Sequence, residues 1–380
     1  AQGVWSNLPI IQIWEFVITG ECSFSWKVNM KISKEVNIEE QYVWFMCCED
    51  YNYWLSPYGQ GEFPQIFLGK HIDMGQRCIP DGIVGLQSKD NKFSDISLKF
   101  SKELGNLARV SNSDFYNKAR ILTIEKVEPE VNTRFLPREY SCFLIEVFLG
   151  PNRQPPINKK TNVIECGKLK FVFAYGKGQI YWDGIELTKK LCLYTSVRSQ
   201  GRWYDSLSSA LWRIVKIEKN MIRTIGRWQH LPMIQLWEFE LIEPNVLKFK
   251  AKMKIIKEIE IDRLQTNIMF SERYMRWLAG ERKGEFPPFK DDVDDDWQRI
   301  WSGPHQIKYI GVLENFVNGN YLPPVLFSSQ TTDPELVSNI VNSDIYYRGR
   351  LLQYLNAKKM ILIPGNYPYF TGKIILDSSY

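Results

Sequence analysis

An internal repeat constrains the fold of this chain more than any other feature. Residues 8–64 align with residues 231–287 at a constant offset of 223 without a gap, and 23 of these 57 positions are identical. A later block, Asn112-Ser113-Asp114 with Arg120, recurs as Asn342-Ser343-Asp344 with Arg350. Identity over this length predicts that one fold is present twice.

The repeat also predicts the domain organisation. A length of 380 residues suits two domains, each large enough to bury its own core. We expect a first domain over residues 1–222, with an extra C-terminal hairpin and helix, and a duplicate over residues 223–380. The second copy carries about seven extra residues between its two blocks, including the acidic loop 291–296. This loop lacks the spacing of a calcium-binding loop, so we interpret it as a solvated charge run.

Residue types and their periodicity favour strands. The chain has 13 Trp, 19 Tyr and 21 Phe, and aromatic residues are enriched in strands. Apolar residues occupy every second position in 24–32, and in 247–255 they alternate with four lysines, Lys248, Lys250, Lys252 and Lys254. This period of two predicts antiparallel strands with one face in water. The lysines would block aggregation at sheet edges or, alternatively, bind an anionic glycan, lipid or RNA.

The expected fold is therefore mostly β, with two tandem homologous antiparallel domains that are either barrels or sandwiches. A few short helices are expected as well. Apolar spacing predicts one at 205–219, and Asp333-Pro334 has the residue types of a helix start, predicting a helix to about Asn342. Residues 101–110 match that second segment in the first copy.

The cysteines leave the cellular compartment open between two interpretations. All seven lie in the first 192 residues, and the chain opens at Ala1 without Met. These features favour an exported protein with two or three disulfides. The alternative is a reducing compartment with buried, unreactive thiols.

Aromatic and acidic residues of the repeated first strands are the candidate ligand-binding residues. Glu15 and Glu238 lie within apolar strands, where a carboxylate needs a partner. They either form structural pairs with Lys or Arg or anchor a ligand, and neighbouring rings either belong to the core or contact a sugar or an apolar ligand. The candidates are Trp14, Glu15, Trp26, Trp237, Glu238 and Phe249.

No motif for catalysis, metal binding or nucleotide binding is found in the sequence. Only three histidines exist, and no C-x-x-C, G-x-S-x-G or Walker sequence occurs, so we expect no metal and no cofactor. The net charge of +5 does not predict specific nucleic-acid binding, and no apolar stretch is long enough for a transmembrane helix. A hydrolase using Glu15, Glu62 and Asp114 is the weakest alternative.

Two short motifs in each copy resemble lipocalins. Each copy begins with Gly-x-Trp, and each later has Asn-Ser-Asp-x-Tyr, although the gap between the motifs is longer than is usual in that family. The resemblance implies a barrel with an apolar cavity. From the residues themselves, the aspartate and arginine of the second motif would cap a helix and form a salt bridge. The structural-motif residues are Gly3, Trp5, Asp114, Arg120, Gly226, Trp228, Asp344 and Arg350.

These observations predict a non-enzymatic, secreted binding protein. Its partner would be a small apolar ligand, a glycan or a protein, and self-association into an oligomer stays open. The alternative is a structural or assembly protein such as a coat, capsid or matrix component.

Overall fold

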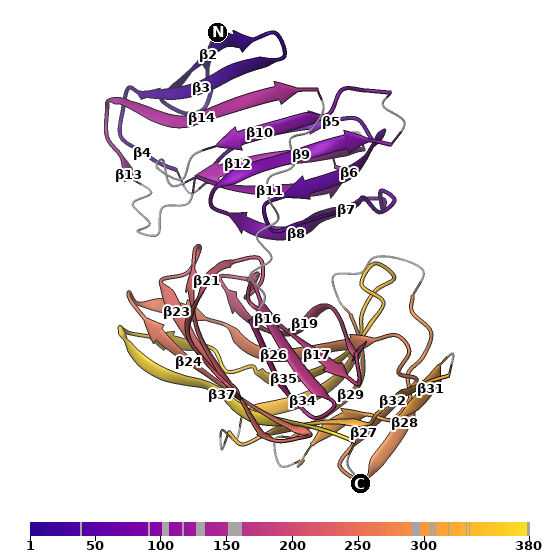
Figure 1. Cartoon of the computed structure of the whole chain (residues 1–380). Coiled ribbons are helices and arrows are strands. Elements are labelled where there is room, and N and C mark those ends of the chain that lie inside the picture. The colour runs from indigo at the N-terminus through magenta and orange to yellow at the C-terminus, as the bar shows by residue number, and fades with distance from the viewer. Residues whose placement is uncertain are drawn as a thin grey trace. The chain divides into compact units, whose positions relative to one another are not determined.

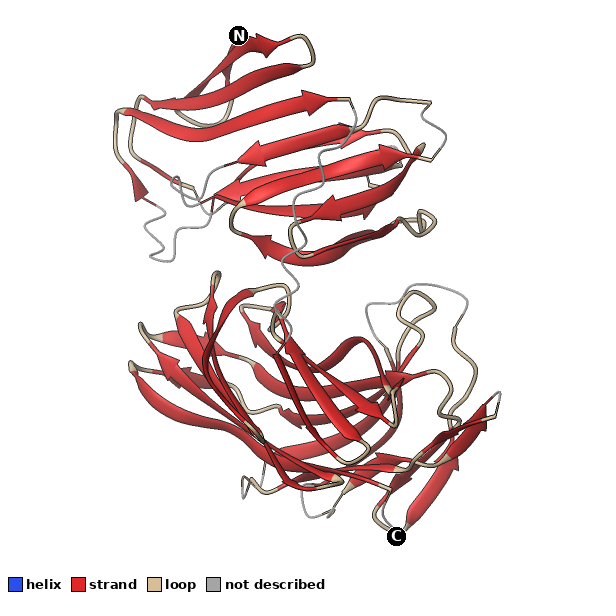
Figure 2. Ribbon diagram, viewed as in Figure 1, coloured by secondary structure: helices blue, strands red, loops and turns tan. Residues whose placement is uncertain are grey.

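The regular structure of the chain consists of strands (Figure 2). The computed structural model describes all residues except 39, 90–91, 101–105, 116–117, 127–133, 151–161, 291–296, 305–306, 308, 318, 332, 334 and 378–380. The acidic loop 291–296 therefore lies outside the described residues. Within the described residues there is no helix, and every assigned element is a strand. The prediction of a mostly β, antiparallel protein is confirmed.

The chain forms two compact units, Ala1–Lys159 and Lys160–Tyr380 (Figure 1). The boundary therefore precedes the position 222/223 that the repeat predicts. Strands within residues 162–218 pair with strands formed by residues 221–228 and 263–271. For this reason they belong to the second unit rather than to the first.

The first unit contains a large sheet and a small sheet. In spatial order the large sheet consists of β1 (Gln2–Val4), β2 (Ile10–Gly20), β3 (Ser23–Ile32), β14 (Glu139–Leu149), β10 (Ile96–Phe100), β9 (Gly82–Ser88), β6 (Tyr51–Ser56) and β7 (Gly59–Glu62). The small sheet consists of β5 (Gln41–Cys47), β12 (Ala119–Lys126), β11 (Asn106–Ser113) and β8 (His71–Ile79). Two short strands, β4 (Val36–Asn37) and β13 (Arg134–Phe135), form a separate pair.

The second unit contains two larger sheets. One consists of β21 (Ala210–Glu218), β22 (Met221–Trp228), β23 (Met233–Glu243), β24 (Val246–Ile255), β37 (Gly365–Leu376), β33 (Val325–Ser329), β30 (Ile310–Val312), β27 (Arg276–Ala279) and β28 (Arg282–Glu285). The other consists of β15 (Asn162–Cys166), β16 (Leu169–Ala174), β17 (Lys177–Trp182), β19 (Thr188–Ser199), β26 (Arg263–Ser271), β35 (Gly349–Asn356), β34 (Leu336–Asn342) and β29 (Gln298–Pro304), with β18 (Ile185–Glu186) on β17 and β20 (Arg202–Asp205) on β19. Two further pairs are β25 (Ile259–Ile261) with β36 (Met360–Leu362), and β31 (Asn315–Val317) with β32 (Asn320–Leu322).

The strand order of the first unit recurs in the second. The order β1-β2-β3-β14-β10-β9-β6-β7 matches β22-β23-β24-β37-β33-β30-β27-β28, and β5-β12-β11-β8 matches β26-β35-β34-β29. The register also agrees, since Gly3 pairs with Gln12 and Gly226 pairs with Gln235. Strands β15 to β21 are additional to this shared order, and they precede β22 in the chain.

Alternating side chains build the core of the second unit. In β24 the apolar residues Leu247, Phe249 and Met253 are buried, whereas Lys252 and Lys254 on the other face are exposed. The predicted lysine face is therefore confirmed. Rings from both sheets meet in the core, as where Tyr354 of β35 lies 5.5 Å from Phe370 of β37. The strand orders are open paths, so these sheets pack as layers and do not close on themselves.

The three helix predictions are wrong where the structure describes them. Residues 210–218 form β21, 106–113 form β11 and 336–342 form β34, while 101–105 and Pro334 lie outside the described residues. β21 contains Ile214, Val215 and Ile217, and β-branched residues of this kind favour strands. Asp333 Oδ1 accepts a hydrogen bond from the backbone N–H of Glu335 at 3.0 Å, so the apparent helix cap is a turn. The structure contains no candidate membrane-spanning helix among its described residues.

The disulfide prediction is also wrong for the residues described. Cys22, Cys47, Cys48, Cys142, Cys166 and Cys192 are all free thiols. Burial raises the pKa of Cys47 to about 12 and that of Cys142 to about 11. A thiol with a raised pKa is a weak nucleophile at neutral pH, so these two cysteines are unreactive components of the strands.

Candidate functional site

The second repeated motif forms a buried arginine clamp in the first unit. Arg120 is 6% exposed, and its Nη1 donates to Pro64 O at 3.3 Å and also to Asn112 Oδ1. The guanidinium lies 4.6 Å from the ring centroid of Phe63. Its Nε donates to Tyr51 O at 3.2 Å. The clamp therefore joins β12 to the loop after β7 and gives a structural reason for the Phe-Pro half of the Gly-Glu-Phe-Pro sequence.

The second unit contains the same clamp. Arg350 Nη1 donates to Pro287 O at 3.0 Å and to Asn342 Oδ1, and the guanidinium lies 4.8 Å from the ring of Phe286. Burial lowers the pKa of Arg350 to about 10. Backbone and amide oxygens, rather than a carboxylate, accept its hydrogen bonds. The hydrogen bonds of these repeated residues tie neighbouring strands and loops together, which is a structural role.

The predicted aspartate–arginine salt bridges are not found in the described contacts. Asp114 Oδ2 accepts from the backbone N–H of Gly69 at 2.8 Å. Asp344 Oδ1 accepts from the backbone N–H of Tyr347 at 2.8 Å, and burial raises the pKa of this carboxyl. Asp114 thus holds the loop before β8, and Asp344 stabilises the turn after β34, while the asparagine two residues before each aspartate is the side-chain partner of the arginine.

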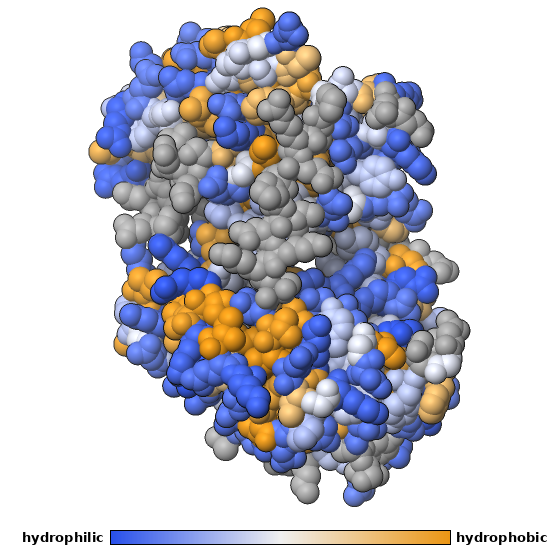
Figure 3. Space-filling view, viewed as in Figure 1, coloured by the Kyte–Doolittle hydropathy of each residue, from blue (hydrophilic) through white to orange (hydrophobic). Residues whose placement is uncertain are grey.

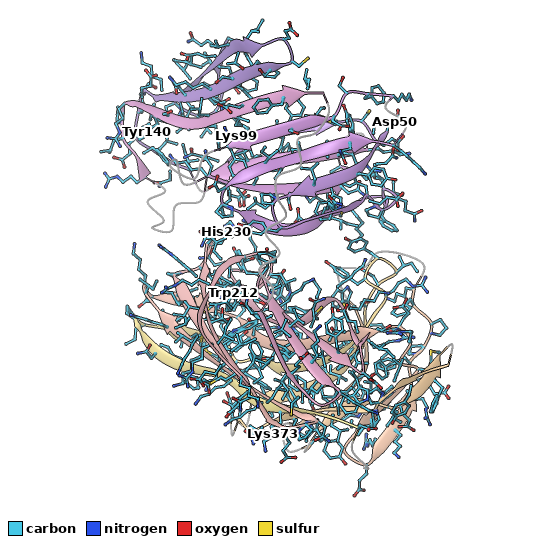
Figure 4. All side chains as sticks on the ribbon, in the orientation of Figure 1. Asp50, Lys99, Tyr140, Trp212, His230 and Lys373 are labelled. Atoms are coloured by element: carbon cyan, nitrogen blue, oxygen red, sulfur yellow. The ribbon has the colours of Figure 1, made fainter. Side chains whose placement is uncertain are left out.

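In the second unit the predicted aromatic ligand-binding residues belong to the core. Trp237 is 1% exposed and Phe249 is fully buried, with their rings 5.3 Å apart. The additional strands cover them: Phe171 of β16 lies 4.4 Å from Phe239, and Trp212 of β21 lies 4.4 Å from Trp237. Figure 4 labels Trp212 in the second unit.

The equivalent face of the first unit is open. Trp14, Phe16 and Ile18 of β2 are 36%, 53% and 85% exposed, whereas their equivalents in β23 are buried. Phe16 stacks on Trp26 of β3 at 5.8 Å, and it lies 6.1 Å from Phe24. We call this surface, made of Trp14, Phe16, Ile18, Phe24 and Trp26, the β2–β3 face. Apolar atoms are visible on the N-terminal strands in Figure 3.

The two predicted glutamates lie on the opposite side of their strands. Glu15 is exposed, and its Oε2 lies 3.7 Å from Lys27 Nζ. Glu238 Oε2 accepts a hydrogen bond from Arg223 Nε at 2.5 Å. Both therefore form cross-strand ion pairs on the side opposite the β2–β3 face, and exposed pairs of this kind contribute little to stability. Glu15 and Asp114 have separate partners, so the described contacts do not assemble the carboxylate pair of a hydrolase.

The surroundings of the Gly-x-Trp motif differ between the two units in the same way: the glycine and tryptophan of the motif are exposed in the first unit and buried in the second. A Cβ added at Gly226 would lie 2.5 Å from the Trp212 ring, and Trp228 is 1% exposed. A Cβ added at Gly3 would have nothing within 4 Å, and Trp5 is 49% exposed. The position that Trp212 occupies in the second unit is thus open in the first.

Sequence reasoning did not identify the residues that create this contrast. Phe171, Phe173 and Trp212 lie in the segment before the second copy, and the repeat gives them no equivalent within residues 1–159. The alternation of Phe171 and Phe173 in β16 indicates a strand with one buried face. Only the structure shows which rings these residues and Trp212 cover.

No family model and no curated protein sequence matches the chain. Among solved structures, a GH36 α-galactosidase, AgaB from Geobacillus stearothermophilus, has 9% identity and a TM-score of 0.38. The match covers 58% of this chain and 40% of the galactosidase. The isotype 1 transferrin binding protein B from serogroup B Neisseria meningitidis has 9% identity and a TM-score of 0.13 over 93% of this chain and 66% of its own. Neither likeness supports a conclusion about fold or function, and the lipocalin resemblance stays a prediction.

Proposed function

We propose that the protein is a binding protein whose first unit binds another polypeptide through the β2–β3 face. One observation carries the proposal: the same face is covered by polypeptide in the second unit and is open in the first. We further propose that the two units arose by tandem duplication, since the strand order, the register and the arginine clamp recur. The exposed side chains are then the part of a shared core that a partner completes.

The chemistry of the face favours a protein partner over a small apolar ligand or a glycan. The neighbours that cover it in the second unit are Phe and Trp side chains on strands. Adjacent rings at alternate positions of two strands form a flat apolar surface, which suits another sheet layer. Clustered exposed apolar side chains of this kind mark interaction sites in soluble proteins.

Site-specific photo-crosslinking tests the proposal. A benzophenone amino acid replaces Phe16, and the matched control places it at Phe316, which is 72% exposed on another strand pair. In cells that produce the chain, we expect position 16 to form crosslinks to a discrete protein and position 316 not to. Crosslinks to lipid or glycan, equal crosslinks from both positions, or none from position 16 would refute protein binding.

A further inference from the structure

One edge of the large sheet in the first unit, strand β1, lies beside the β2–β3 face. β1 is the terminal strand of its sheet, and it pairs only with β2 in the described order. An edge strand has a row of backbone N–H and C=O groups available to a further strand. In the second unit, β22 has the place of β1, and β21 pairs with it as an antiparallel ninth strand.

The register of β21 defines what an added strand must contain. Trp212 lies directly opposite Gly226, and its ring covers the space where a Cβ of Gly226 would be. The same ring lies 4.4 Å from Trp237 and 5.6 Å from Phe173. Ile214, two residues further along β21, also packs against the core. A tryptophan therefore fits beside a strand glycine, followed by an aliphatic residue at the next inward position.

The first unit has the complementary surface. Gly3 is opposite Gln12, as Gly226 is opposite Gln235, and the space beside Gly3 is open. Trp14 has the place of Trp237. Trp26 is 6% exposed, and its Nε1 has no hydrogen-bond partner in the described part of the chain, whereas Phe249 occupies that place in the second unit. A buried N–H of this kind requires an acceptor.

We propose that a strand of a separate polypeptide adds antiparallel to β1 and places a tryptophan opposite Gly3, where its ring packs on Trp14. The proposal rests on the proposed function and specifies its partner: a segment with Trp-x-aliphatic at inward positions. Main-chain hydrogen bonds to β1 provide affinity, and the tryptophan position provides specificity.

The probe is a synthetic peptide with the sequence of residues 209–219, which contains Trp212, acetylated and amidated at its ends. Its affinity for the full chain is measured by isothermal titration calorimetry. The chain variant is Gly3→Leu, because Gly3 lies in an ordinary strand conformation with empty space beside it, so leucine fills the tryptophan position without a clash. The control peptide carries Trp212→Ala.

We expect the peptide to bind the unaltered chain, and Gly3→Leu and the control peptide each to weaken binding at least about tenfold. Circular dichroism checks that Gly3→Leu keeps its fold. Equal binding to the Gly3→Leu chain would overturn the inference, since the peptide would then bind elsewhere, for example by displacing β21. No binding at about 1 mM peptide would also overturn it.

Failure of this inference is distinguishable from failure of the proposed function. Protein crosslinks from position 16 without peptide binding would preserve a polypeptide partner and exclude strand addition at β1. Light scattering adds a second distinction: a mass above the 44.7 kDa monomer that Gly3→Leu abolishes would mean that a second copy is the occupant, which contradicts a separate polypeptide.

Discussion

Phe16 and Phe239 provide a matched test of whether the β2–β3 face is open. They are the same residue type at equivalent positions, but Phe239 is fully buried and Phe16 is 53% exposed. Phe239 has ring neighbours at 4.4 Å and 5.0 Å, Phe171 and Phe249. Truncation of such a core phenylalanine to alanine leaves a cavity and costs about 3–5 kcal/mol of unfolding free energy.

The cost at Phe16 follows from its exposure. Full burial of a phenylalanine side chain contributes about 3 kcal/mol at most, and Phe16 has less than half of its surface removed from water. We therefore expect Phe16→Ala to cost about 1 kcal/mol, with no cavity term because water fills the space. The difference between the two variants is about 2 kcal/mol or more.

Urea denaturation followed by circular dichroism measures the two costs, and hydrogen exchange with mass spectrometry shows which unit opens. Phe316→Ala, at a side chain that is 72% exposed, is the control for a surface substitution. Costs of Phe16→Ala and Phe239→Ala that agree within about 0.5 kcal/mol, the usual range for surface substitutions, would contradict the different exposure of the two rings. Phe16 would then be covered by something, and the face would not be available to a partner.

Three further predictions concern the arginine clamp, the strand glycines and alkaline pH. Arg350→Met removes the donor to Pro287 O and Asn342 Oδ1, so it should lower the unfolding free energy by about 2 kcal/mol in urea denaturation; no measurable change would contradict a structural role. Gly226→Leu should lower the unfolding free energy by more than about 2 kcal/mol, because its Cβ would meet the Trp212 ring at 2.5 Å. Gly3→Leu should leave the melting temperature unchanged, since nothing lies within 4 Å of its Cβ. Equal effects of the two variants would exclude the open position at Gly3. Burial raises the pKa of the Cys192 thiol from 9.0 to about 11, so this thiol ionises at lower pH in the unfolded chain than in the folded one. Its contribution to stability is therefore complete below pH 9 and is lost as the pH rises towards 11. Urea midpoints measured across this pH range should fall for the unaltered chain and fall less for Cys192→Ala.

The sequence could predict those features that depend on local alternation and on the repeat. The lysines of 248–254 point away from buried Leu247 and Phe249, as their period of two requires. The aligned blocks matched the shared strand order, because they contain equivalent hairpins, such as β2–β3 and β23–β24, whose register follows the apolar pattern.

Features that depend on distant segments could not be predicted. The pattern at 205–219 was compatible with a helix, and pairing with β22 rather than local propensity decides that it is a strand. Most acceptors of Arg120 are backbone oxygens of residues more than fifty positions earlier, and its side-chain partner is Asn112, so its nearest acidic neighbour in sequence, Asp114, was the wrong choice.

Only part of the candidate site could be predicted from the sequence. The rings around Trp14 and Trp237 were identified, but the repeat treats the two positions as equivalent. The difference arises from Phe171 and Trp212, which lie outside the repeat and cover only one of the two copies. Whether such an apolar face is buried depends on the segments that pack on it. The sequence of the face itself therefore does not show whether it is exposed.

Hydroxyl-radical footprinting of the full chain reports the solvent exposure of individual side chains in both units at once, so it shows whether the β2–β3 face is open. We expect strong oxidation of Phe16 and Ile18, together with protection of their equivalents Phe239 and Leu241. We also expect the Trp212 peptide to protect the first pair. Equal protection of the two pairs in the isolated chain would contradict an open face in the first unit.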